Sequence, residues 1–255
     1  MIFLKTDEEI ELMKISNTIV AKTLAEVGRN IKPGITTLKL DKIAETFIRD
    51  NGAVPSFLGY NGFPNSICTS VNEQVVHGIP DNYELKEGDI VSVDCGALIN
   101  GFHGDSCYTF TVGSVSHNKV AALLESTKAA LYSGIAQAIE GRRLGDVSFA
   151  IQQQAEKDGF SVVREYTGHG IGRNMHEDPL VRNYGSAGYG LTLRRGMVIA
   201  IEPMFCMGSN KISLSKDGWT ATTNDHLPAA HFEHTVAIGR DKAEILSSFD
   251  FIEIQ

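Results

Sequence analysis

Acidic side chains in unusually apolar surroundings are the first feature of this sequence. Asp94 lies within the apolar run 91–96, and Asp105 follows eleven residues later, beyond Asn100-Gly101. A carboxylate in such a strand is costly unless it is protonated, paired or bound to a cation. Two carboxylates on one sheet face repel each other, and a cation between them would relieve that repulsion. The structural alternative is that one acid caps the turn and the other pairs with a lysine or arginine.

Two further acids and one histidine extend the pattern. Glu202 follows the apolar run 197–201, Glu233 lies within the strand-like segment 230–236, and His169 stands between glycines. A lone histidine is more often structural than a ligand, so His169 counts only in the company of the acids. Four carboxylates and one imidazole suit two bridged divalent ions better than one zinc ion. Such ions polarise a carbonyl and activate water, which makes amide hydrolysis possible without a covalent nucleophile.

Composition limits the class of protein. A chain of 255 residues, 42% hydrophobic and without a compositional break, predicts one catalytic domain over residues 1–255. The apolar start is too short for a signal peptide, and no run reaches membrane-spanning length, so we expect a cytoplasmic protein with no membrane partner. Four cysteines without CxxC spacing favour a reducing compartment. The net charge of -8 argues against DNA binding, although Arg194-Arg195 could touch RNA or the ribosome.

Apolar residues at helical spacing predict the elements that must position the acids. They indicate four helices in two pairs, at about 7–28, 37–52, 120–139 and 147–157. Thr6 and Glu9 form a candidate capping box for the first helix. The glycines that end these segments repeat at an offset of 107 residues, Gly34 with Gly141 and Gly52 with Gly159. The offset indicates a duplicated helix-helix-strand unit, with coincidence as the alternative.

The strands are expected between and after the helices. They are predicted at 67–71, 90–97, 106–112, 162–166, 197–201 and 231–238. Asn100-Gly101 supplies the positive φ angles of a tight hairpin turn. The predicted class is therefore α+β, with a mainly antiparallel sheet.

Five motifs in this order resemble the type I methionine aminopeptidases over nearly the whole chain. They are Val76-His77-Gly78-Ile79-Pro80, Asp94-Cys95-Gly96, Gly168-His169-Gly170-Ile171-Gly172, Ile201-Glu202-Pro203 and Phe232-Glu233-His234-Thr235. The resemblance implies the pita-bread fold, whose halves are related by a pseudo-two-fold axis. It also implies hydrolytic removal of the initiator methionine from nascent proteins when the second residue is small. The 31 residues between Glu202 and Glu233 are too few for the insertion of the type II enzymes.

The same resemblance implies the roles of individual residues. The ligands of two divalent ions (Co, Mn, Fe or Zn) would be Asp94, Asp105, His169, Glu202 and Glu233, with Asp105 and Glu233 bridging. The catalytic residues would be His77, His176 and Glu202, with Glu202 as general base. The methionine pocket would be lined by Tyr60, Phe63, Cys68, His77, Tyr166, His176 and Trp219, and by Phe205 or Met204. The implied substrate is the N-terminal methionine of nascent chains, met at the ribosome by a monomeric enzyme.

Several of these residues have plainer interpretations. Trp219 could cover the core beside a turn, and Cys68 could be an ordinary buried residue. Strand alternation sends Cys95 to the face opposite Asp94, whereas Cys107 could share the face of Asp105. His234 alternates away from Glu233 in the same way. The remaining histidines lack a partner signal and are expected at the surface or in structural positions: His103, His117, His226 and His231.

Two rival functions remain open at this stage. An X-prolyl aminopeptidase or prolidase shares the fold and the five ligands but usually carries an additional N-terminal domain, whereas residue 1 here leads directly into the catalytic half. A catalytically inactive pita-bread protein that acts as a binding module would be expected to have lost ligands, and this chain keeps all five.

Overall fold

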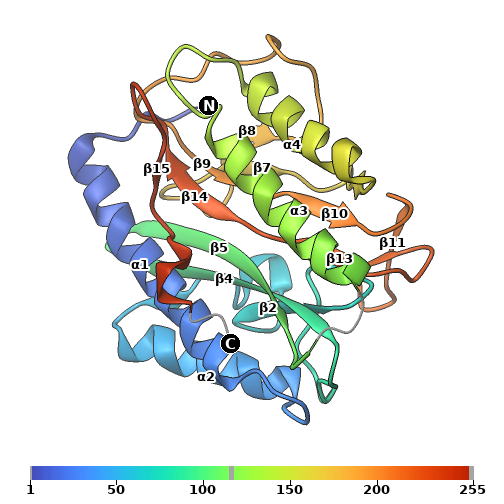
Figure 1. Cartoon of the computed structure of the whole chain (residues 1–255). Coiled ribbons are helices and arrows are strands. Elements are labelled where there is room, and N and C mark those ends of the chain that lie inside the picture. The colour runs from blue at the N-terminus through green and yellow to red at the C-terminus, as the bar shows by residue number, and fades with distance from the viewer. Residues whose placement is uncertain (1, 115–117, 253–255) are drawn as a thin grey trace.

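The computed structural model describes residues 2–114 and 118–252 (Figure 1). The helices are α1 (Asp7–Asn30), α2 (Thr37–Asp50), α3 (Asn118–Ile135) and α4 (Leu144–Asp158), with 3₁₀ turns η1 (Tyr60–Gly62) and η2 (Phe249–Phe251). The first strands are β1 (Val54–Pro55), β2 (Ile67–Val71), β3 (Gln74–Val76), β4 (Ile90–Ile99) and β5 (Phe102–Thr111). The later strands are β6 (Ser161–Val162), β7 (Gly168–Gly170), β8 (Glu177–Val181), β9 (Val198–Ile201), β10 (Met204–Cys206), β11 (Ile212–Leu214), β12 (Ala221–Thr223), β13 (Ala229–His231), β14 (His234–Ala237) and β15 (Glu244–Ile245).

The strands form four sheets, and every pair of named strands in the described ranges is antiparallel. The largest sheets are β1-β4-β2, with β5 beside β4, and β15-β14-β9-β7-β8. The smaller sheets are β13-β10-β6 and β11-β12-β3. The predicted α+β class with mainly antiparallel pairing is confirmed.

The helices begin and end where capping chemistry places them. Thr6 and Glu9 exchange side-chain and backbone hydrogen bonds at 3.2 and 3.1 Å, which confirms the capping box. The third helix ends at Ile135, four residues before the predicted end, because residues 137 and 138 make the tighter i→i−3 bonds of a turn. Among the described helices, none has the length and apolar character needed to cross a membrane.

The predicted duplication is visible in the backbone. The paired glycines have nearly identical φ angles, Gly34 88° with Gly141 87° and Gly52 76° with Gly159 77°. The Gly34 N–H donates to the carbonyl of Leu85 at 2.7 Å, and the Gly141 N–H donates to the carbonyl of Leu193 at 3.0 Å. Figure 1 shows the two helix pairs in corresponding places, α1 and α2 at the lower left and α3 and α4 at the upper right. The two halves therefore repeat one unit.

Each helix pair covers its own hydrophobic core. The core under α1 and α2 includes Leu24, Leu40, Ile48, Val91 and Cys95. The core under α3 and α4 includes Leu131, Val147, Ile151, Ile199 and Phe205. The predicted functional side chains lie on the strand faces and loops between these two cores, so both halves must pack before the site can form.

Three predicted strands differ from the observed ones. The strand predicted over 106–112 begins four residues earlier, at Phe102, and so includes Asp105. The strand predicted over 162–166 is only Ser161–Val162, followed by one further bond from the Val163 N–H to the Met204 carbonyl at 3.0 Å. The strand predicted over 231–238 is interrupted after His231 and resumes at His234. Glu233 lies within this interruption, outside both strands.

One glycine allows α1 to approach β5 unusually closely. A Cβ atom on Gly104 would lie 2.7 Å from the backbone nitrogen of Asn17 in α1. Asn17 uses this proximity, because its Oδ1 accepts the backbone N–H of Asp105 at 3.3 Å. The helix therefore fixes the part of β5 that carries Asp105.

We predict that Gly104→Ala lowers the free energy of unfolding by about 1–3 kcal/mol, because the added methyl group must displace backbone rather than a flexible side chain. Urea unfolding monitored by circular dichroism measures this loss. Gly185→Ala is the matched control, because its Cβ atom would meet only the Ser148 side chain, at 3.2 Å. Equal stability of the two variants would contradict the role given to Gly104.

Candidate metal centre and catalytic pocket

The hairpin of β4 and β5 brings the first two acids together. In its register Asp94 lies opposite Cys107 and Gly96 lies opposite Asp105, so the two carboxylates are diagonal neighbours on one face. The turn uses Asn100 and Gly101 at φ 54° and 76°, as predicted. The register of the hairpin therefore places both carboxylates on the same face of the sheet.

The other two acids lie where a second antiparallel ribbon is interrupted. β9 pairs with β14 and β10 pairs with β13, with Ile201 opposite His234 and Met204 opposite His231. Glu202 and Glu233 therefore face each other across the gap between these pairs. The backbone at the gap is held from β5, because the Glu233 N–H donates to the Cys107 carbonyl at 2.9 Å. The gap frees both carboxylates from the ribbon and turns them toward β5.

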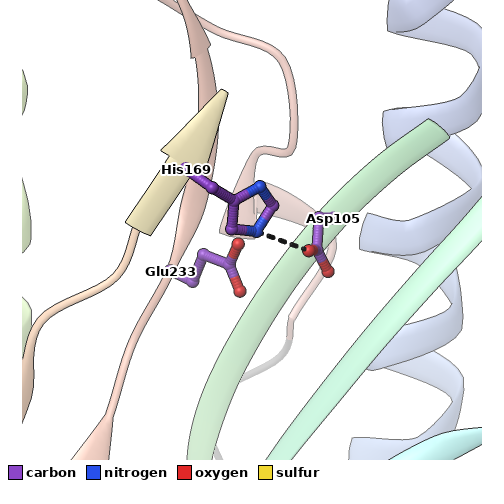
Figure 2. A group of neighbouring side chains, drawn as sticks. All are labelled: Asp105, His169 and Glu233. Atoms are coloured by element: carbon purple, nitrogen blue, oxygen red, sulfur yellow. Dashed lines mark ion pairs between the residues drawn. The ribbon is translucent and has the colours of Figure 1, made fainter. Parts of the chain in front are cut away.

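His169 on β7 completes the group. Its Nε2 lies 3.6 Å from Asp105 Oδ2 and 3.7 Å from Glu202 Oε1, while its Nδ1 is 2.9 Å from the carbonyl of Gly170. The Nδ1 contact fits a tautomer in which Nδ1–H donates, leaving the Nε2 lone pair toward the carboxylates. Figure 2 shows the side chains of His169, Asp105 and Glu233 pointing toward one another. One ligand atom of each lies within 4.8 Å of those of the other two. This spacing is suitable for a shared cation.

Burial dominates the electrostatics of the site. Desolvation raises the pKa of all four carboxyl groups well above their ordinary values, and repulsion from neighbouring acids raises it further at Asp94, Glu202 and Glu233. Burial also lowers the pKa of His169 to about 4, so its imidazole is neutral at physiological pH. A neutral imidazole and negative carboxylates are the protonation states that a metal ion requires.

The donor set fits a divalent cation. Three buried carboxylate oxygens have no hydrogen-bond partner within the described part of the chain: Asp94 Oδ1, Asp105 Oδ1 and Glu233 Oε1. Buried carboxylate oxygens are almost always paired or bound to metal. No lysine or arginine is among the described residues that line the cavity with them. The structural alternative of an arginine or lysine partner for Asp94 and Asp105 therefore finds no support here.

All five acid and histidine side chains open onto one cavity of about 210 Å³. The seven residues predicted for the methionine pocket line the same cavity: Tyr60, Phe63, Cys68, His77, Tyr166, His176 and Trp219. Cys68 on β2 lies opposite Asp94, which brings its sulfur next to the acids. The edge of Trp219 meets Phe63 with ring centroids 5.2 Å apart. The cavity is thus acidic at one wall and aromatic at the other.

Two histidines lie between these walls. The Nδ1 of His176 is 2.7 Å from the Tyr60 hydroxyl, and its ring lies 4.2 Å from that of His169. His77 packs edge-on against Tyr166 at 5.1 Å and has a φ of 58°. Burial lowers the pKa of each to about 4, so both are neutral side chains at pH 7. Each can offer one N–H to a ligand in the cavity.

The backbone around His77 is unusually constrained. A positive φ is uncommon for residues other than glycine, although histidine adopts it more readily than most. The residue after it must be glycine, because a Cβ atom on Gly78 would lie 2.2 Å from the carbonyl oxygen of Thr69. The close approach of this loop to β2 therefore aims the imidazole into the cavity.

The structure corrects two predictions for the pocket. Phe205 and Met204 are fully buried in separate hydrophobic clusters and are not among the described lining residues, because β10 directs them into the cores. His231, expected to be structural, lines the cavity with its Nε2 3.7 Å from Glu202 Oε2. The signal that could have found it is its place two residues before Glu233 in an extended segment. Sequence analysis also missed the lining residues Phe57 and Met175.

The other histidines and cysteines lie as expected or away from the site. Cys95 belongs to the first core, on the face opposite Asp94, and Cys107 is buried beside the site with its Sγ 3.6 Å from the carbonyl of His231. His234 turns away from Glu233 toward Ser247 and Tyr132. His226 is exposed, and His103 contacts the Ser56 hydroxyl at 2.9 Å. His117 lies outside the described residues.

Comparison with known proteins places this geometry in a family. The model of metallopeptidase family M24 matches residues 11–240. The methionine aminopeptidase 1 of Bacillus subtilis (strain 168) is 51% identical over 247 residues, covering 97% of this chain and 99% of that protein. The crystal structure of methionine aminopeptidase from Rickettsia prowazekii superposes with a TM-score of 0.96 at 43% identity, covering 97% and 100% of the two chains.

A more distant structure shares the fold alone. Prolidase from Pyrococcus furiosus has a TM-score of 0.77 at 23% identity, and the match covers 96% of this chain but 65% of the prolidase chain. The extent and identity of the closer matches exceed this fold-level likeness. The chain belongs to metallopeptidase family M24, among its methionine aminopeptidases.

Proposed function

We propose that this protein removes the N-terminal methionine from polypeptides whose second residue is small. The observation that carries the proposal is that five candidate metal ligands line a small cavity together with aromatic and sulfur-bearing side chains. Its relatives from Bacillus subtilis and Rickettsia prowazekii are named for this activity. We also propose that residues 1–255 act as one catalytic domain.

The residues that would hold two divalent ions are Asp94, Asp105, His169, Glu202 and Glu233. Asp105, His169 and Glu233 would form the centre of this set, since one ligand atom of each lies within 4.8 Å of those of the other two. Ions bound there would polarise the scissile carbonyl and activate a water molecule for attack. Mn, Fe, Co and Zn all accept such a ligand set, and their supply in the cell decides among them.

The chain's own groups then have distinct tasks. Glu202 is the proposed general base, because its carboxylate lies at the ribbon gap among the candidate ligands, with Oε1 3.7 Å from His169 Nε2. His176 would donate Nε2–H to the carbonyl oxygen as charge develops, since a Tyr60 O–H donated to Nδ1 fixes that tautomer. His77 would contact the scissile amide nitrogen. Both histidines act as neutral donors, in keeping with their lowered pKa values.

The size and lining of the cavity support methionine as the leaving residue. Phe63, Trp219 and Tyr60 present aromatic faces and edges that favour a thioether. The volume of about 210 Å³ is small for a ligand site, so a methionine side chain would fill much of the cavity and leave little room in it for a large second residue. By this rule the protein keeps its own Met1, which precedes Ile2.

The cellular setting is part of the proposal. All four cysteines are free and buried, which supports a reducing cytoplasm. We propose a monomer that meets its substrates as they leave the ribosome, since nascent chains are the source of new N-terminal methionines.

Substrate specificity tests the proposed function directly. We expect protein reloaded with Co or Mn to cleave Met-Ala-Ser, to cleave Met-Trp-Ser at least ~100-fold more slowly because the second side chain cannot fit, and to leave an Xaa-Pro peptide intact. Peptide hydrolysis followed by chromatography measures all three. Cleavage of the Xaa-Pro peptide alone would establish a prolidase-like enzyme. Absence of both metal binding and hydrolysis would favour the binding module.

The helper histidines provide a second prediction. We expect His77→Ala and His176→Ala each to lower kcat by roughly 10²–10³ while metal content stays unchanged, because each removes a donor that acts in the transition state. Steady-state kinetics on Met-Ala-Ser and elemental analysis of the same samples measure the two effects. The exposed His226→Ala serves as the control. Unchanged turnover in both variants would refute the assigned roles.

A further inference from the structure

A buried ion pair joins the N-terminal segment to the loop that carries His176. The Lys5 Nζ lies 2.6 Å from Glu177 Oε2, and only 5% and 3% of the two side chains are exposed. Lys5 is also fixed through its backbone, because its N–H donates to the Gly196 carbonyl at 2.7 Å, just before β9. Glu177 follows His176 directly and begins β8, where it pairs with Gly170. The ion pair thus connects three segments around the catalytic pocket.

The loop between Gly172 and Glu177 depends on this pair for its shape. The Glu177 Oε1 accepts the backbone N–H of Asn174 at 3.2 Å, so the carboxylate closes the loop on itself. Lys5 fills the space beside Gly172, where an added Cβ atom would lie 2.5 Å from the Lys5 Cε. With its Oε1 and Oε2 both engaged, the Glu177 side chain fixes the backbone that leads into His176.

The energetics favour a positional role over a stabilising one. Removing two charges from water costs more than their attraction usually returns, so a buried pair is weak evidence for stability. A second, exposed pair, Arg173 to Glu9 at 3.0 Å, ties the same loop to α1. Two ion pairs, one of them buried, therefore restrain the conformation of this short loop. Two side chains of that loop line the catalytic cavity, Met175 and His176, and His176 is the one whose ring centroid lies 4.2 Å from that of His169.

We propose that Lys5 and Glu177 are positioning residues that hold His176 at the distance from His169 and Tyr60 at which it contacts the substrate carbonyl. This inference rests on the role proposed above for His176. It assigns a catalytic purpose to the N-terminal segment before α1, which does not itself contribute a metal ligand.

The test removes the pair without leaving an unpaired buried charge. The double variant Lys5→Met/Glu177→Leu is expected to fold and to keep its Co or Mn content, while kcat on Met-Ala-Ser falls roughly 10- to 100-fold with KM little changed. The single variant Lys5→Arg retains the positive charge opposite Glu177 and is expected to keep most of the kcat of the unmodified chain. Arg195→Met is the control, because it breaks the exposed Arg195–Asp7 pair at the same end of α1 and should leave kcat unchanged.

Two further readouts separate positioning from general damage. Amide hydrogen exchange within residues 171–177 should accelerate in the double variant and not in Arg195→Met. Adding the double variant to His176→Ala should lower kcat no further, because the pair acts through that histidine. An unchanged kcat in the double variant, or losses that multiply with His176→Ala, would overturn this inference. A His176→Ala variant with normal kcat would instead overturn the role proposed for His176, and the inference with it.

Discussion

Four carboxylates buried around one imidazole are the constraint on which the rest of the structure depends. Their burial raises the pKa of each, and three carry oxygens without a partner in the described chain. The folded-state pKa values exceed those of unfolded carboxyl groups. The metal-free protein therefore loses stability as pH rises from the unfolded pKa values toward the folded ones. A bound cation reverses this penalty because it favours the charged carboxylates. A divalent cation therefore favours the ionised form of this buried group of acids.

The duplicated fold supplies the acids from two different ribbons. The unbroken β4–β5 hairpin presents Asp94 and Asp105 by register alone, whereas Glu202 and Glu233 lie at the gap where β9–β14 gives way to β10–β13. The helices hold these ribbons from outside, most closely where α1 meets Gly104 beside Asp105. The aromatic and sulfur-bearing wall then closes the cavity. Strands position the candidate ligands Asp94, Asp105 and His169, the gap between strands positions Glu202 and Glu233, and loops carry His77 and His176.

Much of the fold and site could be predicted because the signals were local. Capping and helical period located the helix pairs, glycine spacing indicated the duplication, and charged residues in apolar runs indicated the ligands. The predictions that failed depended on contacts between residues that are distant in sequence. The gap at Glu233 exists because β13 and β14 pair with different partners, and pattern within one strand cannot show that. His231 was missed although it lies two residues before Glu233, because its contact with Glu202 joins residues distant in sequence. Phe205 was misplaced because β10 turns it into the core.

Calorimetric titration of Mn²⁺ into metal-stripped protein tests whether the buried carboxylates form a metal centre. We expect saturable binding of two ions by the unmodified chain and loss of that binding in Asp105→Asn, while Asp50→Asn, which changes an exposed aspartate, binds normally. Binding that is absent from the unmodified chain, or that persists unchanged in Asp105→Asn, would contradict this expectation.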